Sequence, residues 1–318
     1  MDHRIAALAI AAVLALSPST KHAYADTAGE SMDSLVSVEW LAVHLDDPDL
    51  VVLDCSVIVE AGGDGAVVSR SGRERYLEGH IPGAGFADLK GDPVDTDSPI
   101  GYAVPTPEDF AAAMSALGVG DDTRVVLYDG GETAWAARVW WMLRWVGFDN
   151  AALLDGGLPA WTAAGQPLTA ELPSREPKML SVNARPELIA DRDEVFAAIS
   201  DDSVSLIDSL PAGQYTGEQV MYARPGHIES AVNVPIFSML DENLQFRPES
   251  ELRTLFEGRT RDRNVTYCGG GIAASSVAFT LTRLGFEDVA VYTASLQEWA
   301  ADPENPMATG PEPGTEDD

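Results

Sequence analysis

Short apolar runs alternate with longer amphipathic stretches along the chain, and the two kinds of segment predict different elements. Residues 109–118 and 136–147 place apolar side chains at helical spacing and end at or next to glycine, so both are predicted helices. Residues 125–129 and 152–155 are continuous apolar runs too short for an amphipathic helix, which is typical of buried parallel strands. Repeated alternation of strand and helix predicts an α/β fold, with parallel sheets that carry helices on both faces.

The alternation occurs twice, because four segments of the first half recur in the same order in the second half. The pairs are 51–54 with 205–208, 79–84 with 226–231, 124–138 with 264–278, and 147–161 with 285–299. We therefore predict two tandem α/β domains at 26–168 and 187–302, joined by a proline-rich linker at 169–186. The acidic, proline-rich end at 303–318 is predicted to be a flexible tail.

The first 25 residues have the pattern of a secretory signal peptide. Arg4 precedes a twelve-residue apolar run from Ile5 to Leu16, and a polar stretch then ends in an A-x-A site at Ala25. A basic start, a short apolar core and such a site are the parts of a cleaved signal. We expect an exported protein, periplasmic or secreted, with no membrane anchor after cleavage.

The charge of the chain limits its partners. Asp and Glu number 51 against 20 Lys and Arg, which gives a formal net charge of −31 at pH 7. This field repels nucleic acid and anionic membranes, so we expect neither as a partner. With two cysteines and no Cys/His cluster at zinc-like spacing, we expect no disulfide framework, no metal and no organic cofactor.

One cysteine stands where a strand is predicted to turn into a helix. Cys268 follows the apolar run 265–267 and precedes three glycines, after which a helical run begins at Ile272. Glycines let the backbone curl so that successive N–H groups point inward, and a helix start adds its positive dipole end. Both features favour a thiolate, so the pattern indicates a nucleophilic cysteine rather than a packed core thiol.

The tandem repeat with this glycine-rich loop resembles the rhodanese-type sulfurtransferases in their two-domain form. The segments that carry the resemblance are VSVEWLA (36–42), VVLDCS (51–56), RYLEGHIPGAGFADL (75–89), RVWWMLRWVGFDNAALLDGGLPAW (138–161), ARPGHIESAVNVP (223–235), YCGGGIAAS (267–275) and SLQEWAADPENP (295–306). The resemblance implies two rhodanese domains, of which the second is catalytic. Cys268 is then expected to take a sulfane sulfur from a small-molecule donor as a persulfide. It passes this sulfur to an acceptor such as cyanide, a thiol or a thiol-bearing redox protein.

The resemblance implies further site residues. The expected substrate-binding loop consists of Gly269, Gly270, Gly271, Ile272 and Ala273. Arg224 is a candidate for positive charge beside the nucleophile, or else a solvated surface arginine. Asp208 either orients the active loop or is a turn aspartate like Asp54 of the other half. His80 and His227 recur in matching turns of both halves, which favours structural hydrogen bonds over general-base roles.

The first half is expected to have lost this chemistry. Asp129 takes the place of the cysteine there, and a carboxylate cannot form a persulfide, so we expect a structural domain in which Asp129 caps a helix. The other cysteine, Cys55, is interpreted as a small core residue. A disulfide between Cys55 and Cys268 would block the nucleophile, and we do not expect one.

The sulfur donor is left between two substrates of the family. Thiosulfate-specific members commonly carry cationic side chains just after the cysteine, whereas this loop has only glycines. Mercaptopyruvate-specific members have a glycine-serine-glycine loop and two arginines for the substrate carboxylate; the matching positions here are Gln214 and, roughly, Arg224. Gln214 can donate hydrogen bonds to a carboxylate but cannot neutralise it. Since 3-mercaptopyruvate is a cytosolic metabolite, the expected export favours thiosulfate.

Two other functions are alternatives. Rhodanese-like folds also occur in cysteine phosphatases and arsenate reductases, where an arginine six residues after the cysteine binds the oxyanion. Ala274 stands there, so the bidentate clamp for a phosphoryl group is missing. The second alternative is a non-catalytic binding module or sulfur carrier, since the chain already contains one half without the cysteine. The intact cysteine and glycines of the second half argue against it.

Overall fold

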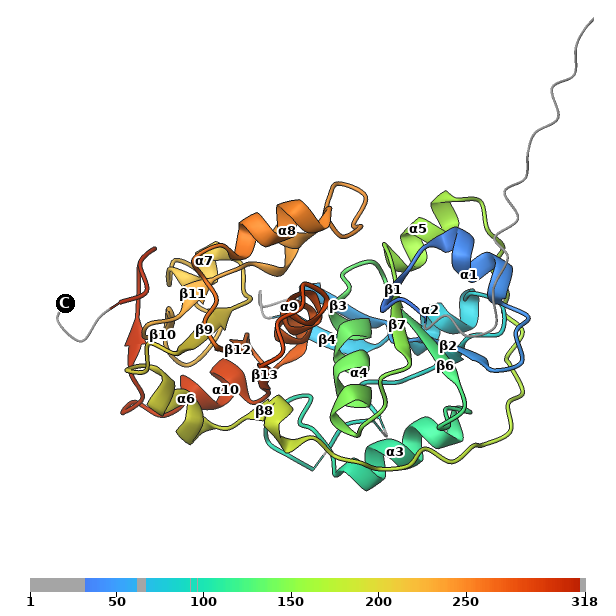
Figure 1. Ribbon diagram of the computed structural model, residues 1–318, viewed down its shortest axis with the longest axis horizontal. Helices are drawn as coiled ribbons and strands as arrows, with labels where there is room; N and C mark the ends of the chain where they lie inside the picture. Colours follow the sequence, from blue (N-terminus) through green and yellow to red (C-terminus); the bar gives the residue numbers. More distant parts are fainter. Residues whose placement is uncertain (1–31, 62–66, 92, 96, 315–318) are drawn as a thin grey trace, which may run out of the picture. The chain divides into compact units, whose positions relative to one another are not determined.

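The computed structural model describes residues 32–61, 67–91, 93–95 and 97–314 (Figure 1). The predicted signal peptide lies outside the described residues. Within the described part of the chain, no helix is long and apolar enough to cross a membrane.

The first half forms a five-stranded parallel sheet in the order β1-β7-β6-β2-β5. Its strands are β1 (Leu35–Val36), β2 (Leu50–Asp54), β5 (Gly85–Phe86), β6 (Arg124–Tyr128) and β7 (Ala151–Leu154), and β3 (Val57–Ala61) pairs with β4 (Val67–Ser71) as a separate antiparallel hairpin. Its helices are α1 (Val38–His44), α2 (Arg73–Glu78), α3 (Pro107–Ala116), α4 (Ala134–Trp145) and α5 (Gly157–Ala163). The two helices and two strands predicted from the pattern are present, within two residues of the predicted ends.

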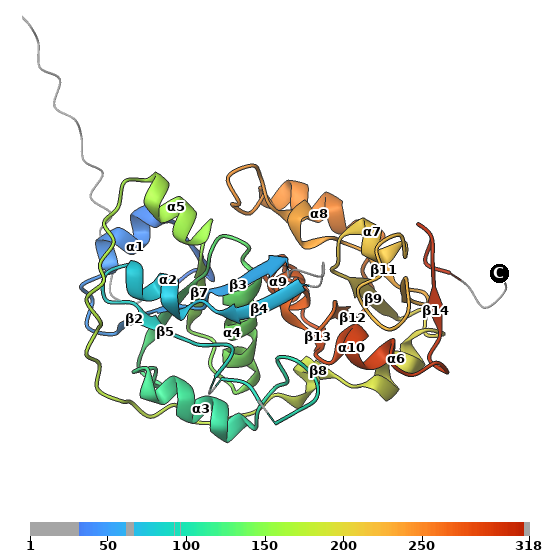
Figure 2. The ribbon, with the colours of Figure 1, turned by 180° about the vertical axis from the view of Figure 1, so that it is seen from behind.

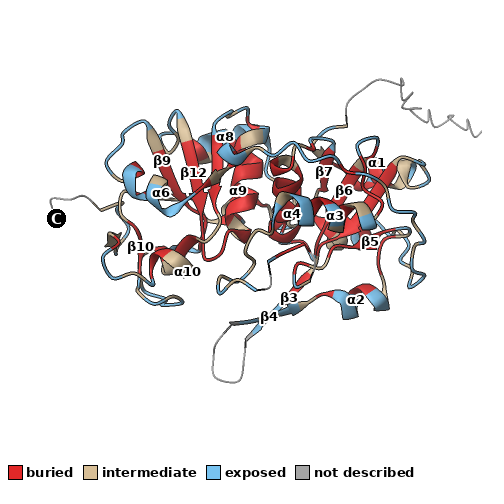
Figure 3. Cartoon of the chain, turned by 90° about the horizontal axis from the view of Figure 1, so that it is seen from below, coloured by how far each residue is buried: buried red, intermediate tan, exposed pale blue. Residues whose placement is uncertain are grey.

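Alternate residues of the strands bury two different faces of this sheet. On β2, Val51 and Leu53 pack in the core that contains α3 and α4, whereas Leu50 and Val52 pack in the core that contains α1 and α5. Side chains of a strand alternate between faces, so an uninterrupted apolar run requires cover on both sides. Figure 3 shows the result, with buried strands between helices whose outer surfaces are exposed. Helices on both faces are therefore confirmed.

The second half repeats this sheet in the order β11-β9-β12-β13-β8, again with parallel pairs. Its strands are β8 (Ile189–Ala190), β9 (Val204–Asp208), β11 (Val232–Asn233), β12 (Arg263–Tyr267) and β13 (Val289–Tyr292). Its helical segments are η1 (Pro186–Leu188), α6 (Arg192–Ala198), α7 (Ala212–Tyr215), η2 (Ile236–Met239), α8 (Glu249–Phe256), α9 (Ile272–Arg283) and α10 (Ser295–Trp299). The corresponding strands occupy the same places in both sheets, so the repeat seen in the sequence is a repeat of structure.

Helices α4 and α9 lie side by side and join the two halves (Figures 1 and 2). Both are buried over most of their length, and the Trp140 and Phe279 rings meet edge to face at 4.9 Å. The Thr133 and Ser276 hydroxyls are 2.9 Å apart at the start of this contact. A helix that is apolar on most sides needs a partner beyond its own sheet, and each helix supplies it for the other.

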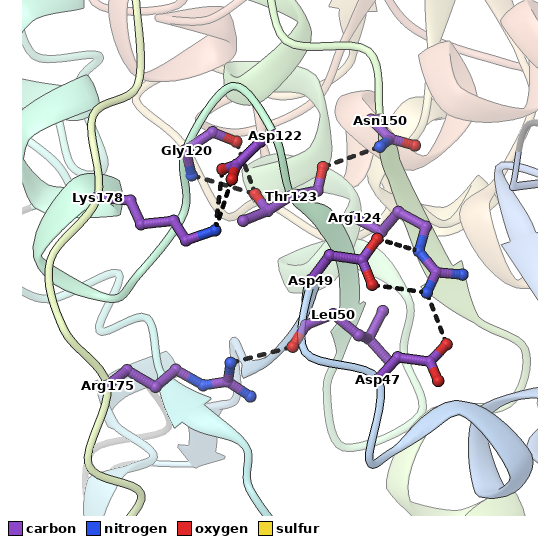
Figure 4. Close-up of polar contacts among 10 residues, drawn as sticks. All are labelled: Asp47, Asp49, Leu50, Gly120, Asp122, Thr123, Arg124, Asn150, Arg175 and Lys178. Carbon is purple, nitrogen blue, oxygen red and sulfur yellow. Dashed lines mark hydrogen bonds and ion pairs between the residues drawn. The ribbon is translucent and has the colours of Figure 1, made fainter.

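The predicted linker at 169–186 runs in extended form along the first domain. Lys178 forms an ion pair with Asp122 at 2.9 Å, and the Arg175 guanidinium donates to the Leu50 carbonyl at 3.0 Å (Figure 4). Thr169 exchanges main-chain hydrogen bonds with His80. These contacts attach the segment to the domain that it leaves.

The end of the chain is held more firmly than its composition predicted. Met307–Ala308 form strand β14, which pairs antiparallel with β10 (His227–Ile228). The Trp299 indole N–H donates to the Pro306 carbonyl at 2.9 Å. The expectation of a flexible tail is therefore wrong for residues 303–314, because backbone pairing and side-chain donors fix an acidic segment whatever its charge. Residues 315–318 lie outside the described part.

Candidate active site

Cys268 is the first residue of a four-residue loop, 268–271, between β12 and α9. Its side chain is buried, at 3% exposure, and its sulfur is not in a disulfide. The Cys268 N–H donates to the Ser295 hydroxyl at 3.1 Å, and its carbonyl accepts from the Leu296 N–H at 3.1 Å. The main chain on either side of the thiol is thereby tied to the start of α10.

The amides that follow the cysteine are free to bind an anion. Among the described residues, no acceptor receives a hydrogen bond from the N–H groups of Gly269 to Ala274. Gly271 takes φ +79° at the N-cap of α9, so these donors and the positive end of the helix lie together. Such an arrangement stabilises a thiolate or another anion at the position of the sulfur.

Close contacts explain the run of three glycines. A Cβ on Gly269 would collide with the Tyr222 hydroxyl, and one on Gly270 would collide with the Gln297 amide. Gly271 has the left-handed φ that favours glycine, and a Cβ there would come within 2.9 Å of the Arg138 guanidinium. The side chains of Tyr222, Gln297 and Arg138, as they lie, therefore leave no room for a larger residue at these three positions.

The loop opens into a cavity of about 330 Å³ that both halves of the chain line. The cysteine loop and the start of α9 contribute Cys268, Gly269, Gly270, Ile272 and Ala273. Most of the remaining wall is apolar, with four aromatic residues, Tyr102, Trp135, Tyr222 and Phe237. Of the predicted loop residues, Gly271 alone is not part of the cavity wall.

Arg138 is a site residue that the sequence analysis missed. It lies on α4 with no exposed surface, and its Nη1 and Nη2 donate to the carbonyls of Gly271 (3.4 Å) and Tyr102 (2.9 Å). Burial lowers the pKa of Arg138 to about 10, while the charge of Cys268 acts in the opposite direction. A buried guanidinium thus ties the active loop to the cavity wall and places positive charge behind the cysteine.

The two predicted anion-binding residues are elsewhere. The Arg224 guanidinium donates to five main-chain carbonyls of the C-terminal segment, among them Asp302 at 2.7 Å and Asn305 at 2.9 Å. Its donors are used to fix that segment, so the expectation of Arg224 beside the nucleophile is not met. Gln214 lies on the four-residue helix α7 and is not part of the cavity wall, although Pro211 of the preceding turn is.

Asp208 lies at the end of β9 and is fully buried. Its Oδ1 accepts the Leu210 N–H at 2.7 Å, which forms the same turn that Asp54 makes with the Ser56 N–H at 2.8 Å. Burial raises the pKa of Asp208 to about 7, against the bonds from Leu210 and Tyr267. Asp208 therefore shapes the cavity wall at Leu210, and within the described part of the chain no hydrogen bond joins its side chain to residues 268–271.

The remaining candidates are structural. The His80 Nδ1 lies 2.8 Å from the Tyr76 carbonyl, and the His80 ring stacks on the Tyr76 ring. His227 makes the same two contacts with Tyr215, again with 2.8 Å between Nδ1 and the carbonyl. The prediction of structural hydrogen bonds is confirmed. Cys55 is fully buried, and burial raises the pKa of its thiol, as expected for a core residue.

Two segments of the chain, 37–164 and 191–302, match the model of the family described as the rhodanese-like domain. The chain belongs to the rhodanese family. Each matched segment contains four of the five strands of one parallel sheet, so both halves of the chain are members.

Relatives of similar length match this chain over nearly their whole length. This rhodanese is 37% identical over 289 residues to a probable 3-mercaptopyruvate sulfurtransferase of Pseudomonas aeruginosa, covering 88% of this chain and 99% of the relative. It is 32% identical over 292 residues to the thiosulfate sulfurtransferase of Rattus norvegicus, with 87% and 96% covered. The crystal structure of a 3-mercaptopyruvate sulfotransferase from Escherichia coli matches with a TM-score of 0.73 at 31% identity, covering 82% of this chain and 98% of the other. This rhodanese is a two-domain sulfurtransferase.

Proposed function

We propose that this protein transfers a sulfane sulfur through a persulfide on Cys268, with no metal or organic cofactor. The observation that carries the proposal is that the free thiol of Cys268 lines a cavity and is followed by loop amides that have no acceptor among the described residues. A persulfide is an anion at neutral pH, so the same donors that stabilise the thiolate also stabilise the loaded enzyme.

The reaction consists of two displacements at sulfur. In the first, the Cys268 thiolate attacks the outer sulfur of thiosulfate, the S–S bond breaks, and sulfite leaves with the electron pair. In the second, a nucleophile such as cyanide or a thiolate attacks the outer sulfur of the persulfide, and Cys268 leaves as a thiolate. Charge and electrons balance across the two steps, so no external oxidant is needed.

We propose thiosulfate or 3-mercaptopyruvate as the donor. Relatives named for each substrate have similar identity to this chain, at 32% and 34–37%. The glycine loop without cations is nearer to the mercaptopyruvate type, whereas the expected export of the protein favours thiosulfate. Export itself is part of the proposal, supported by the signal pattern at residues 1–25. N-terminal sequencing of the protein from the periplasm or medium, starting after Ala25, would support it, and an intact Met1 in the cytosol would reject it.

The test is the intact mass of the reduced protein after brief incubation with thiosulfate and, separately, with 3-mercaptopyruvate. Wild type is expected to gain one sulfur atom, and Cys268→Ser is expected to gain none. Cys55→Ser is the matched control and should load as wild type does, because Cys55 is buried away from the cavity. The faster donor identifies the substrate.

Two results would overturn the proposal. Loading that persists in Cys268→Ser would move the chemistry to another group. A folded wild type that gains no sulfur from either donor would favour the alternative of a non-catalytic binding module or sulfur carrier, in which Cys268 does not catalyse sulfur transfer.

A further inference from the structure

The charge at the wall of the active-site cavity is negative. Among the described residues that line it, Glu132 is the one carboxylate, and Cys268 is the other group proposed to carry a negative charge. The Glu132 Oε2 accepts the Trp135 indole N–H at 3.1 Å, which fixes the carboxylate at the wall. Glu132 is an exposed residue, although partial desolvation of its carboxyl and the nearby Asp129 raise its pKa. The test below is therefore made at alkaline pH.

The nearest cations do not balance this carboxylate at the wall. Arg138 lies behind the loop and is fully buried. The Lys90 ammonium stacks on the Tyr102 ring at 4.3 Å and is not itself part of the wall, and Arg224 is bound to the C-terminal segment. The other titratable group at the wall besides Cys268 and Tyr102 is the Tyr222 phenol, whose pKa is raised by burial and by Cys268.

Aromatic rings make up much of the rest of the wall. The Tyr102 and Trp135 rings lie 5.2 Å apart, and Phe237 is 53% exposed. Ring faces attract cations and alkyl groups. A second carboxylate entering here would meet Glu132 and hydroxyl or amide donors, but no cation among the described residues of the wall. The loop amides do not help an acceptor in this respect, because the persulfide anion already occupies them.

We infer that the cavity selects neutral or cationic thiols as sulfur acceptors over thiols that carry a carboxylate, and that Glu132 sets this preference. The inference rests on the proposed function, since it concerns discharge of the Cys268 persulfide. Glu132 acts on the charge of the incoming molecule and takes no part in bond making.

The experiment measures single-turnover discharge of preloaded persulfide at pH 8 and low salt. The acceptors are cysteamine, 2-mercaptoethanol and 3-mercaptopropionate, which are cationic, neutral and anionic small thiols. The readout is the ratio of the cysteamine rate to the 3-mercaptopropionate rate in each variant. Comparing this ratio between variants cancels the different intrinsic reactivities of the thiols.

Glu132→Gln keeps the hydrogen bond to Trp135 and removes the charge, so the ratio is expected to fall about fivefold, the equivalent of one charge pair at short range in a watery site. Glu132→Lys should lower it further, below that of Glu132→Gln. Glu108→Gln on α3 is the matched control: it makes the same change in net charge far from the cavity wall and should leave the ratio as in wild type.

The outcomes separate the two proposals. A ratio unchanged in Glu132→Gln, or changed equally in Glu108→Gln, overturns the inference and leaves the persulfide mechanism intact. A wild type that cannot be loaded with sulfur overturns both. In 0.5 M salt the rate ratios of wild type and Glu132→Gln should become equal if the effect is electrostatic, because salt screens an exposed carboxylate.

Discussion

The two halves of the molecule contain corresponding strand-to-helix loops that have different roles. In the first, the loop has five residues, 129–133, and in the second four, 268–271. The Asp129 carboxylate fills the first loop. Its Oδ1 accepts the N–H groups of Gly131 and Thr133 at 2.8 and 3.1 Å, and its Oδ2 accepts those of Trp135 and Ala136 at 3.1 Å each. In the second loop the corresponding amides are unpartnered.

The fold thus provides an anion-binding loop, and one side chain decides its use. The Asp129 carboxylate is a permanent anion that closes the first loop, in line with the predicted capping role. The N-cap position of α4 itself is occupied by Thr133. In the proposed function, the cysteine of the second loop supplies an anion that can react and carry a second sulfur. The first loop is therefore a model within the same chain for how the second would hold a persulfide.

The two loops also contact each other through equivalent positions. Arg138 and Ser276 are the fifth residues of α4 and α9, and each reaches the N-cap residue of the other helix, Gly271 and Thr133 respectively. The contact therefore has near two-fold symmetry, and the two sides differ in the side chain that makes it. Ser276 contacts the loop that Asp129 closes, and Arg138 contacts the loop with the cysteine.

Emptying the first loop should produce the largest effect on stability. Asp129→Ala leaves four buried amides without an acceptor, and we expect the free energy of unfolding to fall by about 4 kcal/mol, after allowance for entering water. Asp129→Asn retains an oxygen acceptor and should lose roughly half as much. Urea unfolding measures both. A loss below about 0.5 kcal/mol in Asp129→Ala would mean that the carboxylate is not what closes the loop.

The strand-end aspartates offer a second comparison, through pH. With a folded pKa of about 7, Asp208 stabilises the fold fully below its unfolded value, and this contribution is lost as the pH rises from about 4 through about 7. Asp208→Asn keeps an acceptor for Leu210 and should raise stability at pH 8 relative to pH 5 by about 2 kcal/mol, part of the full linkage. Thermal unfolding at both pH values tests this.

Two further variants serve as a second test and a control for the pH dependence of Asp208→Asn. Asp54→Asn should shift stability in the same direction, since burial also raises the pKa of Asp54. Asp46→Asn, at an exposed position, should show no such pH dependence. If Asp46→Asn matched Asp208→Asn, the effect would come from net charge and not from the buried carboxyl.

Exchanging the cross-domain partner of the active loop should alter thiol reactivity. Arg138→Met removes the charge behind the cysteine, so iodoacetamide alkylation of Cys268 at a fixed pH of 8 should slow severalfold. Arg138→Lys should restore most of the rate. Arg144→Met on the same helix, where the arginine pairs with Asp149 at 3.6 Å, is the control and should leave the alkylation rate unchanged. An unchanged rate in Arg138→Met would assign Arg138 a packing role alone.

The sequence sufficed for the parts of the molecule governed by local pattern. Apolar periodicity located α3, α4, β6 and β7, and the glycines after Cys268 indicated a helix start with inward amides. The repeat predicted two like domains, which the family match confirms. The helices, the strands and the loop depend on residues that are near one another in the chain, and the repeat is a comparison of the chain with itself, so a single sequence shows them all.

The parts that the sequence could not supply depend on distant contacts. Arg138 stands in an apolar helix as one more basic residue, and its partner Gly271 is 133 positions away. Arg224 roughly matches a carboxylate-binding arginine of the resembling family, yet the carbonyls that bind it come from residues 299–305. The end of the chain has the composition of a loose tail, and only its pairing with β10 shows that it is held.

The smallest effect concerns the residue that meets the back of each loop. In the first domain it is Gly157, with φ +56°, and in the second it is Ser295, a non-glycine residue with φ +51°. The Ser295 hydroxyl accepts the Cys268 N–H at 3.1 Å and donates to the Tyr292 carbonyl at 2.6 Å. Two hydrogen bonds thus compensate a left-handed backbone that glycine adopts without strain.

Substitution at Ser295 separates the two contributions. Ser295→Ala loses the hydrogen bonds but keeps the strain, so unfolding free energy should fall by about 1–2 kcal/mol. Ser295→Gly also removes the strain and should lie within about 1 kcal/mol of wild type, while its Cys268 N–H is left without the hydroxyl. If the hydroxyl positions the cysteine, both variants should slow persulfide loading severalfold to the same extent despite their different stabilities. Loading that follows stability instead would show that Ser295 only supports the fold.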